Sequence, residues 1–369
     1  MFLYRIISAG NRQHTLLWSL LPVPLDFTGL SALFNRVISC FASLIDNFLG
    51  KKKIIWGLFL LVALNPGLTE ARVHGGLVLM FDDGYANWLT AVAPELARVG
   101  GVATAYVTLN NIRSEKLTYE DLRNLQNHYG WEIGTHTNHH FNPQEFVKRK
   151  GLSAWTSQEL VSAIRELRTQ GLKIDNLSFP FDATTPEVQA AVVQHLESFR
   201  RPEPLALGSA VREDGSIPGT EISLANYVPL GLIKKWIDLA HNQDRLLFLY
   251  GHQVLPDADF VTGTVEATSP HTLTATEDIK APPGADLYLV PDTSKRSLGG
   301  PIRVVGVAGK QIQVGRGDLR HLTKPGATFM IGPGYGLRWS DFRALVDYAA
   351  PRVKFYTVHQ VVRGQWYKN

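Results

Sequence analysis

The stretch LVLMFDDGY (residues 77–85) joins a run of apolar side chains to two adjacent carboxylates. The run Leu77–Phe81 is short and apolar throughout, which is typical of a parallel strand buried on both faces. Asp82 and Asp83 follow at the point where this strand would end. Adjacent carboxylates repel each other, and a strand directs successive side chains to opposite faces. The pair therefore either starts a turn or carries two separate functions.

After residue 72, short apolar runs alternate with helical patterns. Strands are expected at 77–81, 102–107, 131–134, 177–179, 246–250 and 353–356, and helices at 88–99, 119–128, 157–168, 185–195, 230–240 and 339–348. Strands that are each followed by a helix predict a parallel sheet with right-handed crossovers. Six or seven such units predict an α/β barrel. Residues 200–228 contain several Pro and Gly and are expected to be irregular.

A different rhythm begins after the strand at 246–250. Residues 257–336 contain only short alternating runs separated by Pro, Gly and Asp, at 264–268, 273–276, 287–290, 302–307, 311–314 and 328–331. This pattern predicts a small all-β module. Because the α/β rhythm resumes at 337–369, the module is expected to be inserted into a barrel whose first part is 72–256.

Composition excludes several classes of protein. The chain has 369 residues, 45% of them apolar and 19% charged, which predicts a globular protein. The net charge is +4, of which residues 1–71 supply +3, and no basic cluster with interleaved aromatics is present. We therefore expect no nucleic-acid partner. The single cysteine, Cys40, excludes an intrachain disulfide.

Residues 51–71 have the organisation of an export signal. Lys51, Lys52 and Lys53 precede an apolar run at 54–64, a helix breaker at 65–67 and small residues at Thr69 and Ala71. The run is shorter than the ~20 residues that span a bilayer. We expect a signal peptide or short membrane anchor, and hence an extracytoplasmic protein that is periplasmic, secreted or membrane-anchored. A buried core helix is the alternative.

Residues 1–50 leave two interpretations open. From residue 30 onward apolar side chains recur at helical spacing, with Ser, Asn and Arg opposite. The segment is either an interfacial amphipathic helix, which would associate the protein with a membrane, or upstream sequence preceding a true start near Leu49.

Unusual polar stretches end four of the expected strands. Asp82 and Asp83 end the first, GTHTNHH (134–140) the third, SFPFD (178–182) the fourth and LYGHQ (249–253) the strand expected at 246–250. In a barrel of βα units all these ends lie on one rim, where active sites of such barrels are built. The convergence is stronger evidence for a site than any one stretch, since each alone has a structural explanation.

His136 and His140 have the spacing of a metal-ligand pair. Four residues apart, their imidazoles would face the same way on a helical turn, which Thr137 could brace through its hydroxyl. Two histidines and one carboxylate leave positions on a metal open for water and substrate. His139 has the wrong phase and is expected to be solvated or to support the pair.

The motifs FDDGY, HTNHH and LYGH, in this order, resemble the polysaccharide deacetylase family (carbohydrate esterase family 4). The likeness includes PELARVGGVATAYV after the first motif and LTYEDLRNLQNHYGWEIGTHT up to the second. It covers residues 76–255 and resumes at 337–361, leaving out the β module. It implies a distorted (β/α)7-type barrel, a divalent metal that is usually Zn²⁺ (Co²⁺, Ni²⁺ or Mn²⁺ being possible), and an N-acetylated glycan substrate.

The resemblance also implies roles for individual residues. Its metal ligands would be Asp83, His136 and His140, its general base Asp82 and its general acid His252. The metal would lower the pKa of its water and polarise the acyl carbonyl. Asp82 would then take the proton of this water, and His252 would protonate the departing amine. The oxyanion would contact the metal and the backbone N–H of Phe181, which follows Pro180.

One position departs from the family pattern. Many members carry an arginine in the third motif that orients the base, and Ser178 stands there in this chain. Tyr85 and Tyr250 could stack on sugar rings, although barrel packing also explains them. Besides hydrolysis of N-acetyl groups on chitin-like polymers, peptidoglycan or exopolysaccharide, two readings stay open. One is a carbohydrate-binding protein without catalysis, and the other is a deacylase of a lipid-linked or small N-acyl amide.

Overall fold

The computed structural model describes residues 75–114, 116–208, 211–281, 287–290 and 302–367. The expectations for residues 1–50 and 51–71, an amphipathic or upstream segment and an export signal, lie outside these ranges. Among the residues described, no helix has the length and apolar character that a membrane crossing requires.

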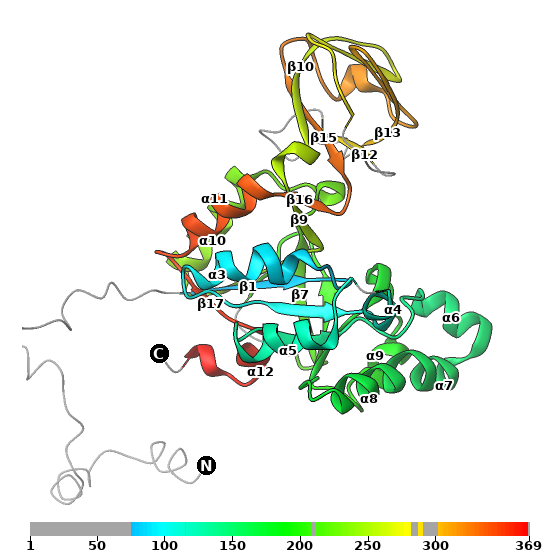
Figure 1. The fold of residues 1–369 in the computed structure, drawn as a ribbon, viewed down its shortest axis with the longest axis vertical. Helices are drawn as coiled ribbons and strands as arrows, with labels where there is room; N and C mark the ends of the chain where they lie inside the picture. Colours follow the sequence, from blue (N-terminus) through cyan, green and yellow to red (C-terminus); the bar gives the residue numbers. More distant parts are fainter. Residues whose placement is uncertain (1–74, 115, 209–210, 282–286, 291–301, 368–369) are drawn as a thin grey trace, which may run out of the picture. The chain divides into compact units, whose positions relative to one another are not determined.

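Seven parallel strands close into a barrel, which confirms the expected (β/α)7-type fold (Figure 1). Strand β8 pairs with every residue of β1, from Gly76 opposite Leu246 to Phe81 opposite Gly251, and so closes the ring. In order around the barrel the strands are β1 (Gly76–Phe81), β2 (Thr104–Val107), β3 (Glu132–Thr135), β4 (Asn176–Ser178), β5 (Ser198–Pro202), β7 (Ser216–Glu221) and β8 (Leu246–Gly251).

An eighth parallel strand fills a gap in this ring. Strand β17 (Lys354–Phe355) pairs with Gly76 and Leu77 at the start of β1, whereas β2 pairs with Met80 and Phe81 at its end. Because β8 occupies the other edge of β1, β17 and β2 share one edge. The barrel is therefore splayed between β1 and β2, and the C-terminal strand covers the opening.

Helices surround the barrel (Figure 1). They are α3 (Ala93–Ala97), α4 (Leu109–Arg113), α5 (Tyr119–Asn127), α6 (Pro143–Lys150), α7 (Leu152–Trp155), α8 (Ser162–Thr169), α9 (Pro186–Val192), α10 (Leu230–Asn242), α11 (Trp339–Ala349) and α12 (Val358–Val362), with π-helical turns at Trp88–Val92 and Thr156–Val161 and 3₁₀ turns at Pro180–Asp182, Leu224–Asn226, Asp257–Asp259, Leu319–His321 and Gln365–Tyr367.

The strands are buried on both faces, as their apolar sequences require. Leu77 and Leu79 pack outward in the same cluster as the helices, including Leu345 of α11. Val78 and Met80 point inward and pack in a separate cluster inside the barrel. Burial of both faces explains why these strands read as continuous apolar runs.

The expectation of an irregular segment at 200–228 is wrong. Strands β5 and β7 lie there, and the short β6 (Leu207–Gly208) pairs antiparallel with β8. Pro and Gly lower strand propensity locally, but pairing with strands on both sides overrides it. The strand at Leu246–Gly251 is consequently the seventh of the barrel, because two strands that were not expected precede it.

The expected all-β module is present as a closed antiparallel barrel. Its strands, in order around the ring, are β10 (Val261–Thr268), β11 (Thr272–Ala275), β14 (Gln311–Val314), β13 (Ile302–Ala308), β12 (Leu287–Val290) and β15 (Thr328–Pro333). Alternate side chains such as Leu273, Ile312 and Phe329 fill its core. Two short strands, which the sequence analysis did not predict, flank the module. They are β9 (Gln253–Leu255) and β16 (Gly336–Arg338), and they pair in parallel.

Candidate metal and catalytic site

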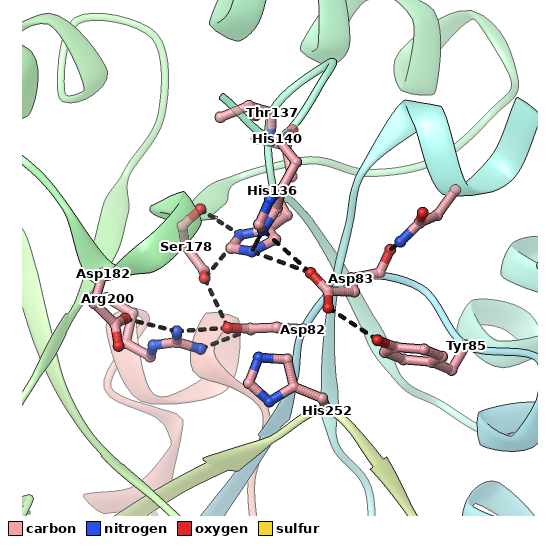
Figure 2. Close-up of polar contacts among 12 residues, drawn as sticks. Asp82, Asp83, Tyr85, His136, Thr137, His140, Ser178, Asp182, Arg200 and His252 are labelled. Carbon is pink, nitrogen blue, oxygen red and sulfur yellow. Dashed lines mark hydrogen bonds and ion pairs between the residues drawn. The ribbon is translucent and has the colours of Figure 1, made fainter. Parts of the chain in front are cut away.

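Asp82 and Asp83 point into different surroundings, as Figure 2 shows. Asp82 ends the strand register of β1, and its N–H donates to the carbonyl of Gly251 at 2.9 Å. Asp83 adopts a left-handed backbone conformation with φ 81°, which turns its side chain away from that of Asp82. The two carboxylates are therefore separated by a change in backbone conformation and not by strand alternation alone.

Asp83, His136 and His140 bring three potential ligand atoms together, all within 4.8 Å of one another. Oδ1 of Asp83 lies 3.6 Å from Nε2 of His136 and 3.3 Å from Nε2 of His140. The two imidazole Nε2 atoms are 3.2 Å apart. In the part of the chain that the structure describes, this is the one group of three such residues with the geometry of a metal site.

The surroundings of these residues fit a cation. Nδ1 of His136 donates to the carbonyl of Ser178 at 2.8 Å, which leaves its Nε2 lone pair directed at the cluster. Oδ2 of Asp83 accepts the Tyr85 hydroxyl at 3.2 Å, which leaves Oδ1 facing the histidines. Burial raises the pKa of Asp83, but the hydrogen bond with His140 and the positive charge that His136 and His252 would carry when protonated outweigh burial and hold the pKa well below its usual range. The pKa of His136 is lowered by burial, so its imidazole is neutral, as ligation requires.

The two imidazoles of His136 and His140 lie together as predicted, but the expected helical turn between them is wrong. Residues 136–140 form no helical turn. Thr137 and His140 instead take left-handed conformations, with φ 69° and 62°, and the bent loop brings the rings together. The Thr137 hydroxyl is buried and has no hydrogen-bond partner among the described residues, so it does not brace the loop.

His139 points away from the cluster and supports the loop from outside. Its Nδ1 lies 2.7 Å from Oε1 of the buried Glu159, whose Oε2 accepts the His139 N–H at 2.9 Å. This agrees with the expectation that His139 is not a ligand. The Glu159 carboxylate fixes the backbone between His136 and His140.

Arg200 is the partner of Asp82 (Figure 2). Its Nη1 donates to Oδ1 of Asp82 at 2.7 Å and its Nη2 to Oδ2 at 2.6 Å, which is a bidentate pair. Ser178 adds a hydroxyl donor to Oδ2 at 3.2 Å. The arginine absent from the third motif is thus replaced in space by one on β5, and Ser178 contacts the same carboxylate.

The barrel interior holds Arg200 in a fixed orientation. Its guanidinium lies 3.6 Å from the centre of the Tyr250 ring, and its Nη2 also donates to Asp182 at 3.1 Å. A Cβ on Gly219 would lie 2.7 Å from Cδ of Arg200, so the absence of a side chain there makes room for the arginine. Tyr250 is buried and donates its hydroxyl to Asp182 at 2.5 Å, which assigns it to packing and not to sugar stacking.

Electrostatics keep Asp82 ionised. Burial raises the pKa of its carboxyl, but the charge and the hydrogen bonds of the Arg200 guanidinium outweigh burial, so the pKa lies below the ordinary value. A carboxylate has about four lone-pair positions, and Arg200 and Ser178 occupy three. Asp82 is therefore a charged, oriented acceptor that retains capacity for one more proton donor.

His252 is held through one ring nitrogen. Its Nδ1 lies 3.1 Å from Oγ of Ser223 and 3.5 Å from Oε1 of Glu221, while its backbone carbonyl accepts the indole N–H of Trp88 at 2.6 Å. Burial raises the pKa of Glu221, opposed by the positive charge that His252 carries when protonated. The contacts at Nδ1 leave Nε2 as the atom that can exchange a proton with a ligand at the rim.

Strained backbone gathers at this rim. Of the non-glycine residues described with left-handed φ, five lie here and only Asp244 lies elsewhere; the five are Asp83, Thr137, His140, Phe181 and Asp182. Such conformations cost free energy and are typical of functional sites. Pro180 is buried at the start of the turn after β4, and Phe181 is 63% exposed with its ring 4.7 Å from that of His140.

Three residues of the site, Arg200, Glu221 and Ser223, were not predicted from the sequence. Glu221 and Ser223 follow β7, whose strand had not been expected. A signal for Arg200 exists in SFRRP (198–202), where Phe199 packs outward and Arg200 must point inward. A charged side chain at an inward position of a strand requires a charged partner inside the barrel.

Residues 72–198 match the family model described as polysaccharide deacetylase. No curated protein matches the chain. Among solved structures, a family 4 carbohydrate esterase from Streptomyces lividans in complex with acetate is similar with a TM-score of 0.34 and 13% identity, over 48% of this chain and 79% of that one. The deacetylase PplD of Streptococcus pyogenes, also in complex with acetate, has a TM-score of 0.34 and 14% identity, over 38% and 61%.

A polysaccharide deacetylase from Bacillus cereus is similar with a TM-score of 0.31 and 15% identity, over 38% of this chain and 44% of that one. The match thus spans less than two thirds of the Streptococcus and Bacillus proteins. At these TM-scores none of the structural likenesses carries function across to this chain. The family match instead rests on the same residues that contribute Asp82, Asp83, His136 and His140. Residues 72–198 of this chain are thus similar to the polysaccharide deacetylase family, over about a third of its length.

Proposed function

We propose that the protein is a metal-dependent deacetylase that hydrolyses N-acetyl groups on a carbohydrate. The observation that carries the proposal is the arrangement of the two adjacent carboxylates. Asp83 joins His136 and His140, while Asp82 is held by Arg200 with room for one more proton donor. A binding protein has no need of an oriented base beside a cation site.

Asp83, His136 and His140 would hold the metal. One carboxylate oxygen and two imidazole nitrogens form a donor set that Zn²⁺ accepts, with positions left over for other ligands. When bound, the ion polarises the acetyl carbonyl and makes water more acidic. Co²⁺, Ni²⁺ and Mn²⁺ accept the same donors, so the donor set alone does not select Zn²⁺.

Asp82 and His252 would carry the proton transfers. Asp82, ionised and oriented by Arg200, takes a proton from the water that attacks the acetyl carbon. His252 gives a proton from Nε2 to the nitrogen as the C–N bond breaks, so acetate and a free amine leave. Glu221 and Ser223, at Nδ1, orient the ring.

The substrate would enter over the exposed side of the rim. The exposed ring of Phe181 lies beside His140, and the backbone N–H of Phe181 would donate to the oxyanion. Substrates of this kind are N-acetylated chitin-like polymers, peptidoglycan or exopolysaccharide. An extracytoplasmic location, through the signal sequence expected at residues 51–71, would bring the enzyme to such polymers.

A carbohydrate-binding protein without catalysis is a weaker alternative. The absent arginine of the third motif and the inserted β module both allow it, but Arg200 donates to both oxygens of Asp82 in place of that arginine. The other alternative is a deacylase of a lipid-linked or small N-acyl amide. Membrane association through residues 1–71, which lie outside the described residues, would bear on it.

The test is acetate release from a panel of substrates, with metal content measured on the same samples. Residues 72–369 are purified, loaded with Zn²⁺ or Co²⁺, and incubated with chitooligosaccharides, peptidoglycan fragments and a small N-acyl amide. We expect acetate from at least one glycan and none after chelation. Bound metal without release from any glycan would contradict the proposal.

A further inference from the structure

Tyr335 places an exposed aromatic ring next to the proposed acid. It lies in the segment GPGYG (332–336), where the chain returns from the inserted β barrel. Its ring centre is 4.8 Å from that of His252, with the planes inclined at 58°, and the residue is 48% exposed. Large aromatic side chains that stay half exposed beside a reacting group are suited to contact a ligand.

Backbone contacts on both sides fix the position of this ring. The N–H of Ala225 donates to the carbonyl of Gly334 at 2.7 Å, and the N–H of Gln253 donates to the carbonyl of Tyr335 at 3.3 Å. Gly336 then begins the pairing of β16 with β9, opposite Gln253. Because Gln253 follows His252 directly, Tyr335 and His252 are carried by adjacent, hydrogen-bonded segments.

The flanking glycines link this segment to aromatic side chains of the β module. A Cβ on Gly334 would lie 2.3 Å from the Tyr288 ring, and one on Gly336 would lie 3.0 Å from the Phe260 ring. Neither position accepts a side chain without displacing those rings. The module therefore packs closely on both neighbours of Tyr335, while the Tyr335 ring itself stays exposed.

A sugar ring is the ligand that this arrangement fits. The face of an aromatic ring packs well against the C–H-rich face of a sugar, and the tyrosine hydroxyl tolerates water at its edge. A second exposed ring, Phe181, lies beside His140. Both candidate groups, a metal ligand and the acid, thus have an exposed aromatic neighbour from a different part of the chain.

We propose that Tyr335 is a substrate-positioning residue that stacks on a sugar ring of the glycan and aligns the acetamide nitrogen with His252. This inference rests on the proposed function and deepens it, since it makes the inserted β module part of the substrate-binding surface. The substrate is then an oligomer or polymer, because a ring stacked on Tyr335 adds affinity only where the glycan reaches beyond the metal site.

The experiment compares Tyr335→Ala and Tyr335→Phe with Val305→Ala, which removes an exposed apolar side chain of β13 in the module. KM and kcat are measured on N-acetylglucosamine oligomers of increasing length. Binding of the longest oligomer is measured by calorimetry in the Asp82→Asn background. Tyr335→Ala should weaken binding and raise KM about threefold to tenfold, with a smaller effect on kcat. Tyr335→Phe, which keeps the ring, should bind the oligomer as tightly as the parent protein. Val305→Ala should have the same oligomer affinity, KM and kcat as the parent protein.

The pH profile separates stacking from a packing role. If Tyr335 acted only by packing against His252, Tyr335→Ala would shift the alkaline or acid limb of the kcat profile and leave oligomer affinity unchanged, which would overturn the inference. Unchanged affinity with unchanged turnover would overturn it as well. Oligomer binding that needs Tyr335, in a protein that releases no acetate, would support the inference and contradict the deacetylase.

Discussion

Arg200 and Asp82 form a buried, bidentate ion pair between two strands of one barrel, although 118 positions separate them in the chain. Asp82 directly follows β1 and Arg200 lies in β5, so only closure of the barrel brings them together. The pair holds both oxygens of the proposed base in one orientation.

Arg200→Lys should lower kcat about tenfold to hundredfold while metal binding stays intact. Lysine keeps the charge but cannot donate to both oxygens, so Asp82 loses its orientation. Arg200 donates its hydrogen bonds to Asp82 and Asp182, and none of these bonds reaches the proposed metal ligands Asp83, His136 and His140. The matched control is Arg201→Lys, since the Arg201 side chain is 42% exposed and pairs with Asp214. Equal kcat for the two variants would show that orientation by Arg200 is unnecessary.

Gly219→Ala should lower kcat as Arg200→Lys does, although it replaces no charged residue. The new Cβ would meet Cδ of Arg200 at 2.7 Å, so the arginine has to shift. We expect a loss of unfolding free energy of about 1–3 kcal/mol, as in overpacked cores, together with reduced kcat. Gly208→Ala is the control, because a Cβ there meets nothing within 4 Å. Thermal unfolding and steady-state kinetics measure the two effects, and a fully active Gly219→Ala would argue against tight positioning.

His140→Ala should abolish both metal binding and turnover. It removes one of three converging donors, and we expect Zn²⁺ affinity to fall more than about 100-fold, measured by competition with a chelating dye. His139→Ala, at the adjacent position, should keep the metal because its ring pairs with Glu159. Retained turnover in His140→Ala would remove His140 from the ligand set.

His252→Ala should slow amide hydrolysis about 100-fold or more and ester hydrolysis much less. An amine leaves only when protonated, whereas an alcohol is a better leaving group, so the acid matters most for amides. Rates on an N-acetyl sugar and on an O-acetyl sugar give the ratio. His241→Ala, which removes a ring bonded to the carbonyl of Arg352 in another part of the barrel, is the control. An equal loss on both substrates would argue that His252 is not the proton donor.

Glu132 should make the protein less stable as the pH rises from about 4.5 to about 7. Burial raises the pKa of this carboxyl to about 7, against hydrogen bonds from the His359 N–H and the Thr104 hydroxyl that lower it. The folded state then holds a proton that the unfolded state has released, so unfolding becomes easier with rising pH. The linked loss is at most about 3 kcal/mol.

Glu132→Gln cannot titrate and should remove this part of the pH dependence, seen in urea unfolding at pH 5 and pH 8. Glu120→Gln, an exposed glutamate of α5, serves as the control. Parallel stability curves for the parent and Glu132→Gln would contradict the assignment.

Local patterns in the sequence predicted much of this protein. Continuous apolar runs predicted the strands β1, β2 and β8. A parallel barrel strand is buried on both faces, so its inward and its outward side chains are both apolar. Polar residues that follow strands, such as Asp83 and His136, could be assigned to one rim since all parallel strands end there. The strands of the β module were predicted from the alternation of apolar and polar residues.

Other features depend on contacts between distant segments. Strands β5 and β7 are rich in residues that disfavour strands, and only pairing inside the closed barrel makes them regular. The sequence alone determined which side chains end the strands and therefore which chemistry collects on the rim. Only the tertiary structure decided that Arg200 orients Asp82 and that Tyr335 adjoins His252, because both contacts arise where segments far apart in the chain are brought together by barrel closure and by the return from the β module.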